Sequence, residues 1–204
     1  MSNEEQILVI PASVVDSIGI IDGFTTDVDR FLIPILASDQ LCFRPRGAME
    51  LDPGFKQLIP HVILQYCDSA GTLFLFTYTR GNGQGEARLH AKRSFGIGGH
   101  ISQEDAAGGA NPYETGMRRE LDEEVTISTP YTPSRMGLIY DDATEVGRVH
   151  LGVVHRFELQ RPNVKSNEDD LSDASFVSID ILRQDRDRLE MWSQICLDAI
   201  YGTP

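Results

Sequence analysis

Arg119-Glu120-Leu121-Asp122-Glu123-Glu124-Val125 is the stretch of sequence that decides the fold. If it is helical, its three glutamates stand at i, i+3 and i+4, so their carboxylates share one face. Met117 begins an apolar stripe that continues at i+4 and i+8 and can dock the helix on a sheet. The spacing therefore predicts a short helix over Tyr113 to Val125.

Three carboxylates on one helix face repel one another and destabilise an isolated helix unless something positive binds them. A hard cation that prefers oxygen ligands, Mg²⁺ or Mn²⁺, is the natural partner. Arg119 lies four residues before Glu123 and can hold that carboxylate in place. Charge runs of this kind are usually solvated helix faces, so the interpretation depends on the surrounding sequence.

About twenty residues upstream stands Phe95-Gly96-Ile97-Gly98-Gly99-His100, a strand that runs into a double glycine. Glycines permit close backbone approach, so a carbonyl there can join a metal shell or an amide can meet a phosphate. Together the two stretches resemble the Nudix box, G-x5-E-x7-R-E-U-x-E-E-x-G-U, where U is a bulky aliphatic residue. The resemblance covers roughly residues 57–204 and includes the later segment Phe176–Ile179.

The resemblance implies an α/β (α+β) fold, a Nudix-like α/β/α sandwich with a mixed sheet. It also implies a pyrophosphohydrolase acting on phosphoric anhydrides, with Mg²⁺ or Mn²⁺ as cofactor. The expected substrate is a small-molecule diphosphate, in which a nucleoside diphosphate is linked to another moiety. Residues 1–56 are expected to be an N-terminal extension that packs on the hydrolase domain of residues 57–204.

The roles of the box residues carry over by position. Gly99 matches the first box glycine, and Gly98 matches the residue whose carbonyl completes the metal shell. Glu120 and Glu124 match the main metal-binding glutamates, either of which can also help to activate water. Glu123 matches the third acid, and Arg119 matches the arginine that orients a glutamate. The catalytic residues implied by the resemblance are Arg119, Glu120, Glu123 and Glu124, and the metal ligands are Gly98, Glu120 and Glu124.

The sequence departs from the box in three places. Nineteen residues, 100–118, separate the glycine from the arginine where the box has thirteen, so about six extra residues fall in the Ser102–Asn111 loop. Asn111 stands where the first box glutamate belongs, and either Glu104 or Glu114 could substitute for it. Thr126 replaces the last box glycine, which affects only the helix exit.

Loop acids offer candidates for the catalytic base, which some Nudix enzymes take from a separate loop. They are Asp141, Asp142 and Glu145, or the acids from Glu168 to Asp173. Asp141 and Asp142 are equally good turn formers.

A cationic row precedes the double glycine in the strand predicted over Arg88 to Ile97. Alternation places Arg88, His90 and Lys92 on one side and Arg93 on the other, so the first three are predicted to bind the substrate. A net charge of −13 argues against a nucleic-acid polymer as the partner, because a polyphosphate backbone requires a basic face.

Periodicity and turn chemistry place the remaining elements. Strands are expected over Ile7–Ile10, Leu58–Tyr66, Thr72–Thr79, Met136–Tyr140, Val149–Leu159 and Phe176–Ile179, and helices over Val28–Ala37, despite Pro34, and Leu182–Ile200. Asp68 to Gly71 is a hairpin turn between two of these strands. His150 and His155 would point to opposite faces of their strand, so each is interpreted as a core or loop histidine.

No apolar stretch is long enough to span a membrane, the N-terminus is polar, and three scattered cysteines fit a reducing cytoplasm. A homodimer built through residues 1–56 is compatible with the resemblance. Two alternatives stay open. One is a catalytically impaired Nudix-like sensor that only binds a nucleotide. The other is an enzyme like the isopentenyl diphosphate isomerases, which needs a cysteine near the glycines, whereas Cys67 lies some thirty residues away.

Overall fold

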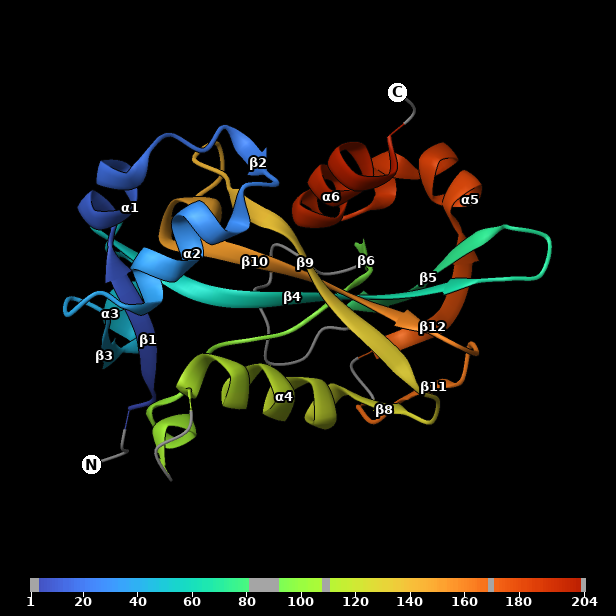
Figure 1. Cartoon of the computed structure of the whole chain (residues 1–204), viewed down its shortest axis with the longest axis horizontal. Helices are drawn as coiled ribbons and strands as arrows, with labels where there is room; N and C mark the ends of the chain where they lie inside the picture. Colours follow the sequence, from blue (N-terminus) through green and yellow to red (C-terminus); the bar gives the residue numbers. More distant parts are fainter. Residues whose placement is uncertain (1–3, 81–91, 108–110, 169–170, 203–204) are drawn as a thin grey trace. The chain divides into compact units, whose positions relative to one another are not determined.

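The computed structural model describes residues 4–80, 92–107, 111–168 and 171–202 (Figure 1). It combines helices with a ten-stranded mixed sheet, which confirms the predicted fold class. The strands are β1 Gln6–Pro11, β2 Gly23–Thr25, β3 Cys42–Pro45, β4 Phe55–Cys67, β5 Leu73–Arg80, β6 Arg93–Ser94, β7 Gly96–Ile97, β8 Val125–Ile127, β9 Tyr131–Tyr140, β10 His150–Leu159, β11 Val164–Ser166 and β12 Leu171–Ser178. The α-helices are α1 Ala12–Ile18, α2 Val28–Leu36, α3 Arg46–Met49, α4 Pro112–Glu124, α5 Ile179–Gln184 and α6 Met191–Tyr201, and the 3-10 helices are η2 Gln103–Ala106, η3 Gly147–Val149 and η4 Arg186–Arg188.

Strands of the large sheet follow the order β12-β5-β4-β10-β9-β2, and a separate pair joins β11 to β8. Beside this path, β1 pairs with β3 and β4, β6 pairs with β5, and β7 pairs with β4. The chain forms two compact units. The first comprises residues 1–61, 98–120 and 135–154, and the second comprises residues 62–97, 121–134 and 155–204. The separation of residues 1–56 from residues 57–204 stays a prediction.

In the first unit, α2 forms although Pro34 lies inside it, because its apolar face outweighs the missing backbone donor. Val28, Phe31, Leu32 and Ile35 recur at helical spacing and are all buried. They join one apolar core with Leu8 and Ile10 of β1, so the predicted strand and helix at the N-terminus are both confirmed.

In the second unit, β4 and β5 form the predicted hairpin. Asp68 Oδ1 accepts hydrogen bonds from the backbone N–H groups of Ala70 and Thr72, at 2.9 and 2.8 Å. Gly71 takes a positive φ of 83°, which side chains disfavour, and this closes the turn. Cys67 then pairs with Leu73, as the turn chemistry requires.

The strand predicted over Arg88 to Ile97 is not continuous in the residues that the structure describes. β6 pairs with β5, whereas β7 pairs with β4, so the partner changes at Phe95. The N–H group of Phe95 donates to Ser193 Oγ of α6 at 3.1 Å. Positions 88–91 lie outside the described residues.

The single C-terminal helix predicted over Leu182 to Ile200 is wrong, because the chain leaves helical geometry at Leu189 and Glu190 (Figure 1). Leu189 forms a bridge with Arg93, and the backbone N–H of Glu190 donates to the Arg93 carbonyl at 2.9 Å. The Glu190 carboxylate then accepts from the N–H of Ser193 at 3.1 Å and caps α6. Backbone pairing with β6 therefore separates α5 from α6.

None of the helices in the described part of the chain is long and apolar enough to cross a membrane.

Candidate active site

The helix that carries the three glutamates, α4, begins with favourable capping chemistry. Asn111 Oδ1 accepts a hydrogen bond from the Tyr113 N–H at 3.1 Å, and Pro112 occupies the first helical position, where its missing donor costs nothing. Asn111 is the residue that stands in place of the first box glutamate. It serves the start of the helix, and its side chain is committed to that backbone contact.

The faces of α4 agree with the periodicity of the sequence. Met117, Leu121 and Val125, the residue after the helix, are buried, which confirms the predicted apolar stripe. Glu120 and Glu124 are partly buried, whereas Glu123 is exposed. The helix thus holds two of its carboxylates at the margin of the core and presents the third to solvent.

Arg119 holds a fixed position through contacts within the first unit. Its Nε and Nη2 lie 2.9 and 3.0 Å from the two carboxylate oxygens of Asp105, and its Nη1 lies 2.8 Å from Glu120 Oε1. Nη2 also donates to the carbonyl of His100 at 3.0 Å. The hydrogen bonds to Asp105 are the largest cause that raises the pKa of Arg119, so the guanidinium stays charged. Arg119 therefore joins the helix to the loop that follows Gly99.

Asp105 is the acid that faces Arg119 in the inserted loop, and sequence reasoning missed it. Its buried carboxylate accepts from the N–H of Ser102 at 2.7 Å, as one half of a capping box at the start of η2. Glu104, one of the two residues expected to substitute, is exposed on η2. Glu114, the other, is exposed on α4 with its carboxylate 3.9 Å from Arg135. The Ser102-x-x-Asp105 spacing was the signal that could have identified this residue.

The glycines of the box allow close backbone approaches. Gly98 has φ of 155°, and a Cβ there would collide with the carbonyl of Pro60, so no other residue fits. A Cβ on Gly99 would collide with the carboxylate of Glu120. Glu120 is therefore packed directly against the main chain of the double-glycine turn.

The end of α4 is capped although Thr126 replaces the last box glycine. The Asn167 side chain donates to the Asp122 carbonyl, and its backbone N–H donates to the Glu124 carbonyl, both at 2.9 Å. Thr126 Oγ1 donates to Asn167 Oδ1 at 2.7 Å. A side chain from the β11–β12 connection thus supplies the helix termination that glycine supplies in the box.

The candidate loop acids differ in how they are used. Asp141 is buried and accepts from the Ala143 N–H and the Thr144 hydroxyl, at 2.9 and 2.8 Å, which makes it a turn former. Asp142 lies 3.2 Å from the ammonium group of the buried Lys56. Glu145, Glu168 and Asp173 are exposed, and positions 169 and 170 lie outside the described residues. Whether any of these acids is the catalytic base stays a prediction.

Of the predicted substrate-binding residues, Arg88 and His90 lie outside the described residues. Lys92 precedes β6, and its ammonium group donates to the Asp187 carbonyl at 3.0 Å. Within the described chain, Lys92 therefore attaches the start of β6 to η4.

Known proteins match the chain along most of its length. Protein YmaB of Bacillus subtilis (strain 168) is 36% identical over 180 residues, which are 84% of this chain and 85% of that protein. The crystal structure of Tm1382, a candidate Nudix hydrolase, has a TM-score of 0.75 at 28% identity and covers 97% of this chain and 98% of its own.

More distant solved structures share the fold alone. DR0079 from Deinococcus radiodurans has a TM-score of 0.56 at 14% identity, over 81% of this chain and 94% of that one. A Nudix hydrolase from Alicyclobacillus acidocaldarius has a TM-score of 0.52 at 12% identity, over 73% of this chain and 92% of that one. No protein-family model matches the sequence.

The mixed sheet and its helices match the fold of solved Nudix structures. The chain belongs to the Nudix family.

Proposed function

We propose that this chain is a Mg²⁺-dependent Nudix hydrolase that cleaves the pyrophosphate bond of a nucleoside diphosphate linked to another moiety. One observation carries the proposal: the Glu120 carboxylate is held between the Arg119 guanidinium, at 2.8 Å, and the main chain of Gly99. The Glu120 carboxylate is repelled by the other carboxylates on its helix face, yet the structure holds it in a defined orientation. This is what we expect of a metal ligand and not of a solvated surface charge.

The residues fit a hard divalent ion such as Mg²⁺ or Mn²⁺. A Cβ at position 99 would collide with Glu120 Oε2, so a side chain there would displace the Glu120 carboxylate from the double-glycine turn. A carboxylate and a main-chain turn in contact are oxygen-rich surroundings, which these ions prefer. We assign the ligand roles to Glu120, Glu124 and the Gly98 carbonyl.

A bound ion would neutralise charge on the pyrophosphate and lower the pKa of a water that attacks it in line. Arg119, fixed by Asp105, orients Glu120 toward the double-glycine turn. Glu124 stands one helical turn beyond Glu120 on the same face, where it can share the ion. Glu123, exposed on the same helix, or one of the loop acids removes the proton from the attacking water.

The chemistry selects a class of substrate and not one molecule. Nucleotide sugars, ADP-ribose, dinucleotides and oxidised nucleoside triphosphates all contain the bond, as do non-nucleotide diphosphates. Lys92, with Arg88 and His90, is our candidate for binding their anionic groups, in a protein whose net charge is −13. We place the protein in the cytoplasm, with residues 1–56 as an extension of the hydrolase domain.

The test is a coupled phosphate-release assay over a panel of these substrates, with Mg²⁺, with Mn²⁺ and with excess EDTA, in which a phosphatase frees phosphate from monophosphate products and a pyrophosphatase splits any pyrophosphate released. Glu120→Gln and Glu124→Gln should each lower kcat by about 10² or more with the fold intact. Asp122→Asn on the exposed side of the same helix is the matched control and should keep the wild-type rate.

Three outcomes would contradict the proposal. Turnover that survives EDTA would remove the metal. Near wild-type rates in both glutamate variants would place the chemistry elsewhere. Tight nucleotide binding without any turnover across the panel would favour the sensor.

A further inference from the structure

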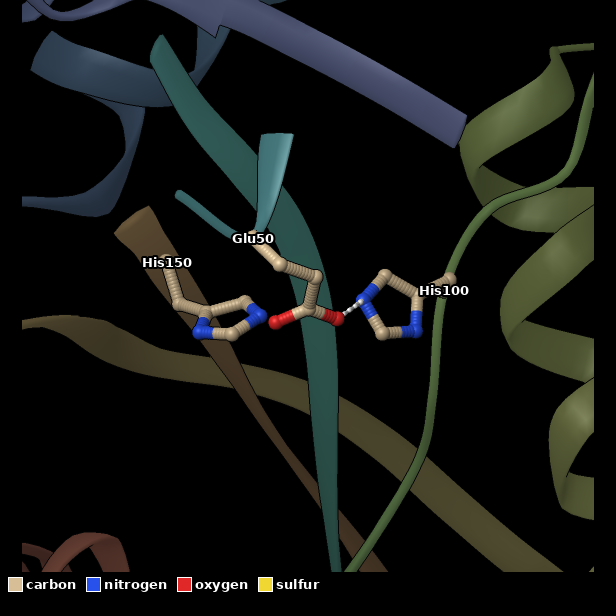
Figure 2. Close-up of side chains that lie close together, drawn as sticks. All are labelled: Glu50, His100 and His150. Carbon is tan, nitrogen blue, oxygen red and sulfur yellow. Dashed lines mark ion pairs between the residues drawn. The ribbon is translucent and has the colours of Figure 1, made fainter. Parts of the chain in front are cut away.

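A group of side chains that could hold a metal ion lies in the first unit, and it includes none of the glutamates of α4. Glu50 follows α3, His100 follows the double-glycine turn, and His150 is the first residue of β10. One potential ligand atom from each lies within 4.8 Å of those from the other two. Figure 2 shows the Glu50 carboxylate between the two imidazole rings. Three segments far apart in sequence thus bring two nitrogens and a carboxylate to one point.

A hydrogen bond at His150 Nδ1 determines the tautomer of this ring, and with it which nitrogen can offer a lone pair toward Glu50. His150 Nδ1 lies 2.7 Å from the Val146 carbonyl, which can only accept, so Nδ1 carries the proton. Nε2 therefore has a lone pair, and Figure 2 shows this nitrogen pointing toward one oxygen of Glu50. A backbone carbonyl that fixes the tautomer of a histidine in this way is a common feature of protein metal sites.

His100 approaches the same carboxylate from the other side, with Nε2 at 3.9 Å from Glu50 Oε1. The same nitrogen lies 2.8 Å from Oε1 of the buried Gln57. The Gln57 amide nitrogen donates a hydrogen bond to the Met49 carbonyl, so the oxygen is the atom that faces His100. Without an ion, His100 Nε2–H donates to Gln57 Oε1. With an ion, the His100 proton lies on Nδ1 and the Nε2 lone pair binds the metal, and the amide oxygen of Gln57 stays within reach as a fourth donor.

Ion pairing between Glu50 and charged histidines does not explain why these three side chains meet. Burial is the largest cause that lowers the pKa of both histidines, and it brings the pKa of His100 to about 3. The positive charge beside Glu50 comes from Arg46, whose Nε lies 3.3 Å from Oε1 and which also pairs with Glu5 at 2.9 Å. A histidine binds a metal through the lone pair of one imidazole nitrogen, and a glutamate binds it through its carboxylate oxygens.

We propose that Glu50, His100 and His150 bind one divalent transition-metal ion of the Zn²⁺ class, at a site separate from the glutamates of α4. Two imidazole nitrogens and one carboxylate suit Zn²⁺, whereas Mg²⁺ and Ca²⁺ prefer oxygen ligands alone. Ligands about 2.1 Å from a tetrahedral ion lie about 3.4 Å apart, so the side chains need only to close slightly.

The site has a structural consequence for its surroundings. His100 directly follows Gly99, and its carbonyl accepts a hydrogen bond from Arg119. An ion on the His100 ring would anchor this segment in addition to its backbone contact with Arg119. The inference does not depend on the proposed hydrolysis, because none of its three ligands belongs to the box glutamates.

The test uses untagged full-length protein, stripped with a chelator and then titrated with Co²⁺ and Zn²⁺. A Glu120→Gln/Glu124→Gln background removes the α4 carboxylates as competing ligands. We expect one equivalent of bound metal by elemental analysis, a visible Co²⁺ spectrum with nitrogen ligands, and a higher Tm with Zn²⁺. Mg²⁺ at the same concentration should not displace the ion.

Single substitutions in that background locate the site. Glu50→Gln and His150→Gln should each weaken Zn²⁺ binding at least about a hundredfold, since loss of an outer partner alone costs about 10–100-fold. Glu5→Gln removes a carboxylate from the same arginine without removing a ligand, so it should retain one equivalent. Glu50 is partly exposed, so its variant remains informative if the variant of the buried His150 does not fold. Absence of binding in the background protein, or unchanged affinity in Glu50→Gln, would overturn the proposal.

Discussion

The guanidinium of Arg119 meets the carboxylate of Asp105 in a two-point contact, with Nε to Oδ1 at 2.9 Å and Nη2 to Oδ2 at 3.0 Å. Paired hydrogen bonds of this kind fix the plane of the guanidinium as well as its position. The third nitrogen, Nη1, is then directed at Glu120. Asp105 therefore positions Glu120 through Arg119, without belonging to the Nudix box.

Asp105→Asn should accordingly lower activity through Arg119. An amide has only one acceptor oxygen, and its NH2 group would face the second guanidinium nitrogen with a donor, so the two-point contact is lost and Arg119 and Glu120 lose their fixed orientation. We expect kcat to fall about 10- to 100-fold, as for a charge-assisted contact, with a smaller change in KM. Steady-state kinetics and urea unfolding on the same protein separate this effect from misfolding. If Glu104→Gln lowers kcat and Asp105→Asn does not, then Glu104 is the substitute for the first box glutamate.

Gly116→Ala, a substitution in α4, tests the contact between Asp105 and Arg119. Alanine normally stabilises a helix by about 1 kcal/mol relative to glycine. A Cβ at this position would lie 2.5 Å from Asp105 Oδ2 and 2.7 Å from Ile101 Cδ1, so it would displace the carboxylate. We expect a loss of about 1–3 kcal/mol in the free energy of unfolding, as for overpacking, together with reduced kcat.

Urea unfolding of Gly116→Ala decides the sign of this effect. Arg118→Ala, on the exposed side of the same helix, serves as control and should be close to neutral. A stabilised and fully active Gly116→Ala protein would show that Asp105 does not depend on this glycine.

Local patterns predicted the parts of the fold that local forces determine. The face of α4 follows from the spacing of Met117, Leu121 and Val125, and its start follows from the Asn111-Pro112 cap. The β4–β5 hairpin follows from the turn residues between Cys67 and Leu73. In these segments the residues whose interactions determine the structure are close together in the sequence, so a local pattern is enough to predict the structure.

Contacts between distant segments account for what the sequence did not predict. The helix break at Leu189 and Glu190 depends on the backbone of Arg93, nearly a hundred residues earlier. Asp105 was not predicted, because the comparison with the box suggested only Glu104 and Glu114 as substitutes for the first glutamate. A loop has no periodicity that indicates which of its side chains is buried. The meeting of the Glu50 carboxylate with two histidines is likewise a product of the tertiary fold.

Lys92→Ala tests substrate recognition against a structural role. A lysine that binds a phosphate of both substrate and transition state should, when removed, raise KM more than it lowers kcat. The expected effect is about 1–3 kcal/mol, as for a charge-assisted hydrogen bond. Arg93→Ala should leave KM unchanged. If Lys92→Ala leaves KM unchanged but lowers the free energy of unfolding, the role of Lys92 is structural, through its contact with the Asp187 carbonyl.

The Arg186–Asp198 pair should make stability depend on pH. Arg186 Nε lies 3.0 Å from Asp198 Oδ1 and Nη2 lies 2.6 Å from Oδ2, which joins η4 to α6. The hydrogen bonds from Arg186 lower the pKa of Asp198. A carboxylate whose folded pKa is lowered adds stability above its unfolded pKa of about 3.9, and this contribution is lost as pH falls through the folded pKa.

Asp198→Asn should therefore be less stable than the wild type at pH 7, by about 0.5–1 kcal/mol, because both partners are substantially exposed and solvent screens the pair. The difference should shrink as pH falls from about 4 toward 3, and it should also shrink in high salt. Urea unfolding of both proteins across this range measures it. Asp187→Asn, a fully exposed carboxylate 3.8 Å from the same arginine, is the matched control and should change little. A deficit in Asp198→Asn that stays constant or grows at low pH would show that Asp198 stabilises α6 through something other than its charge.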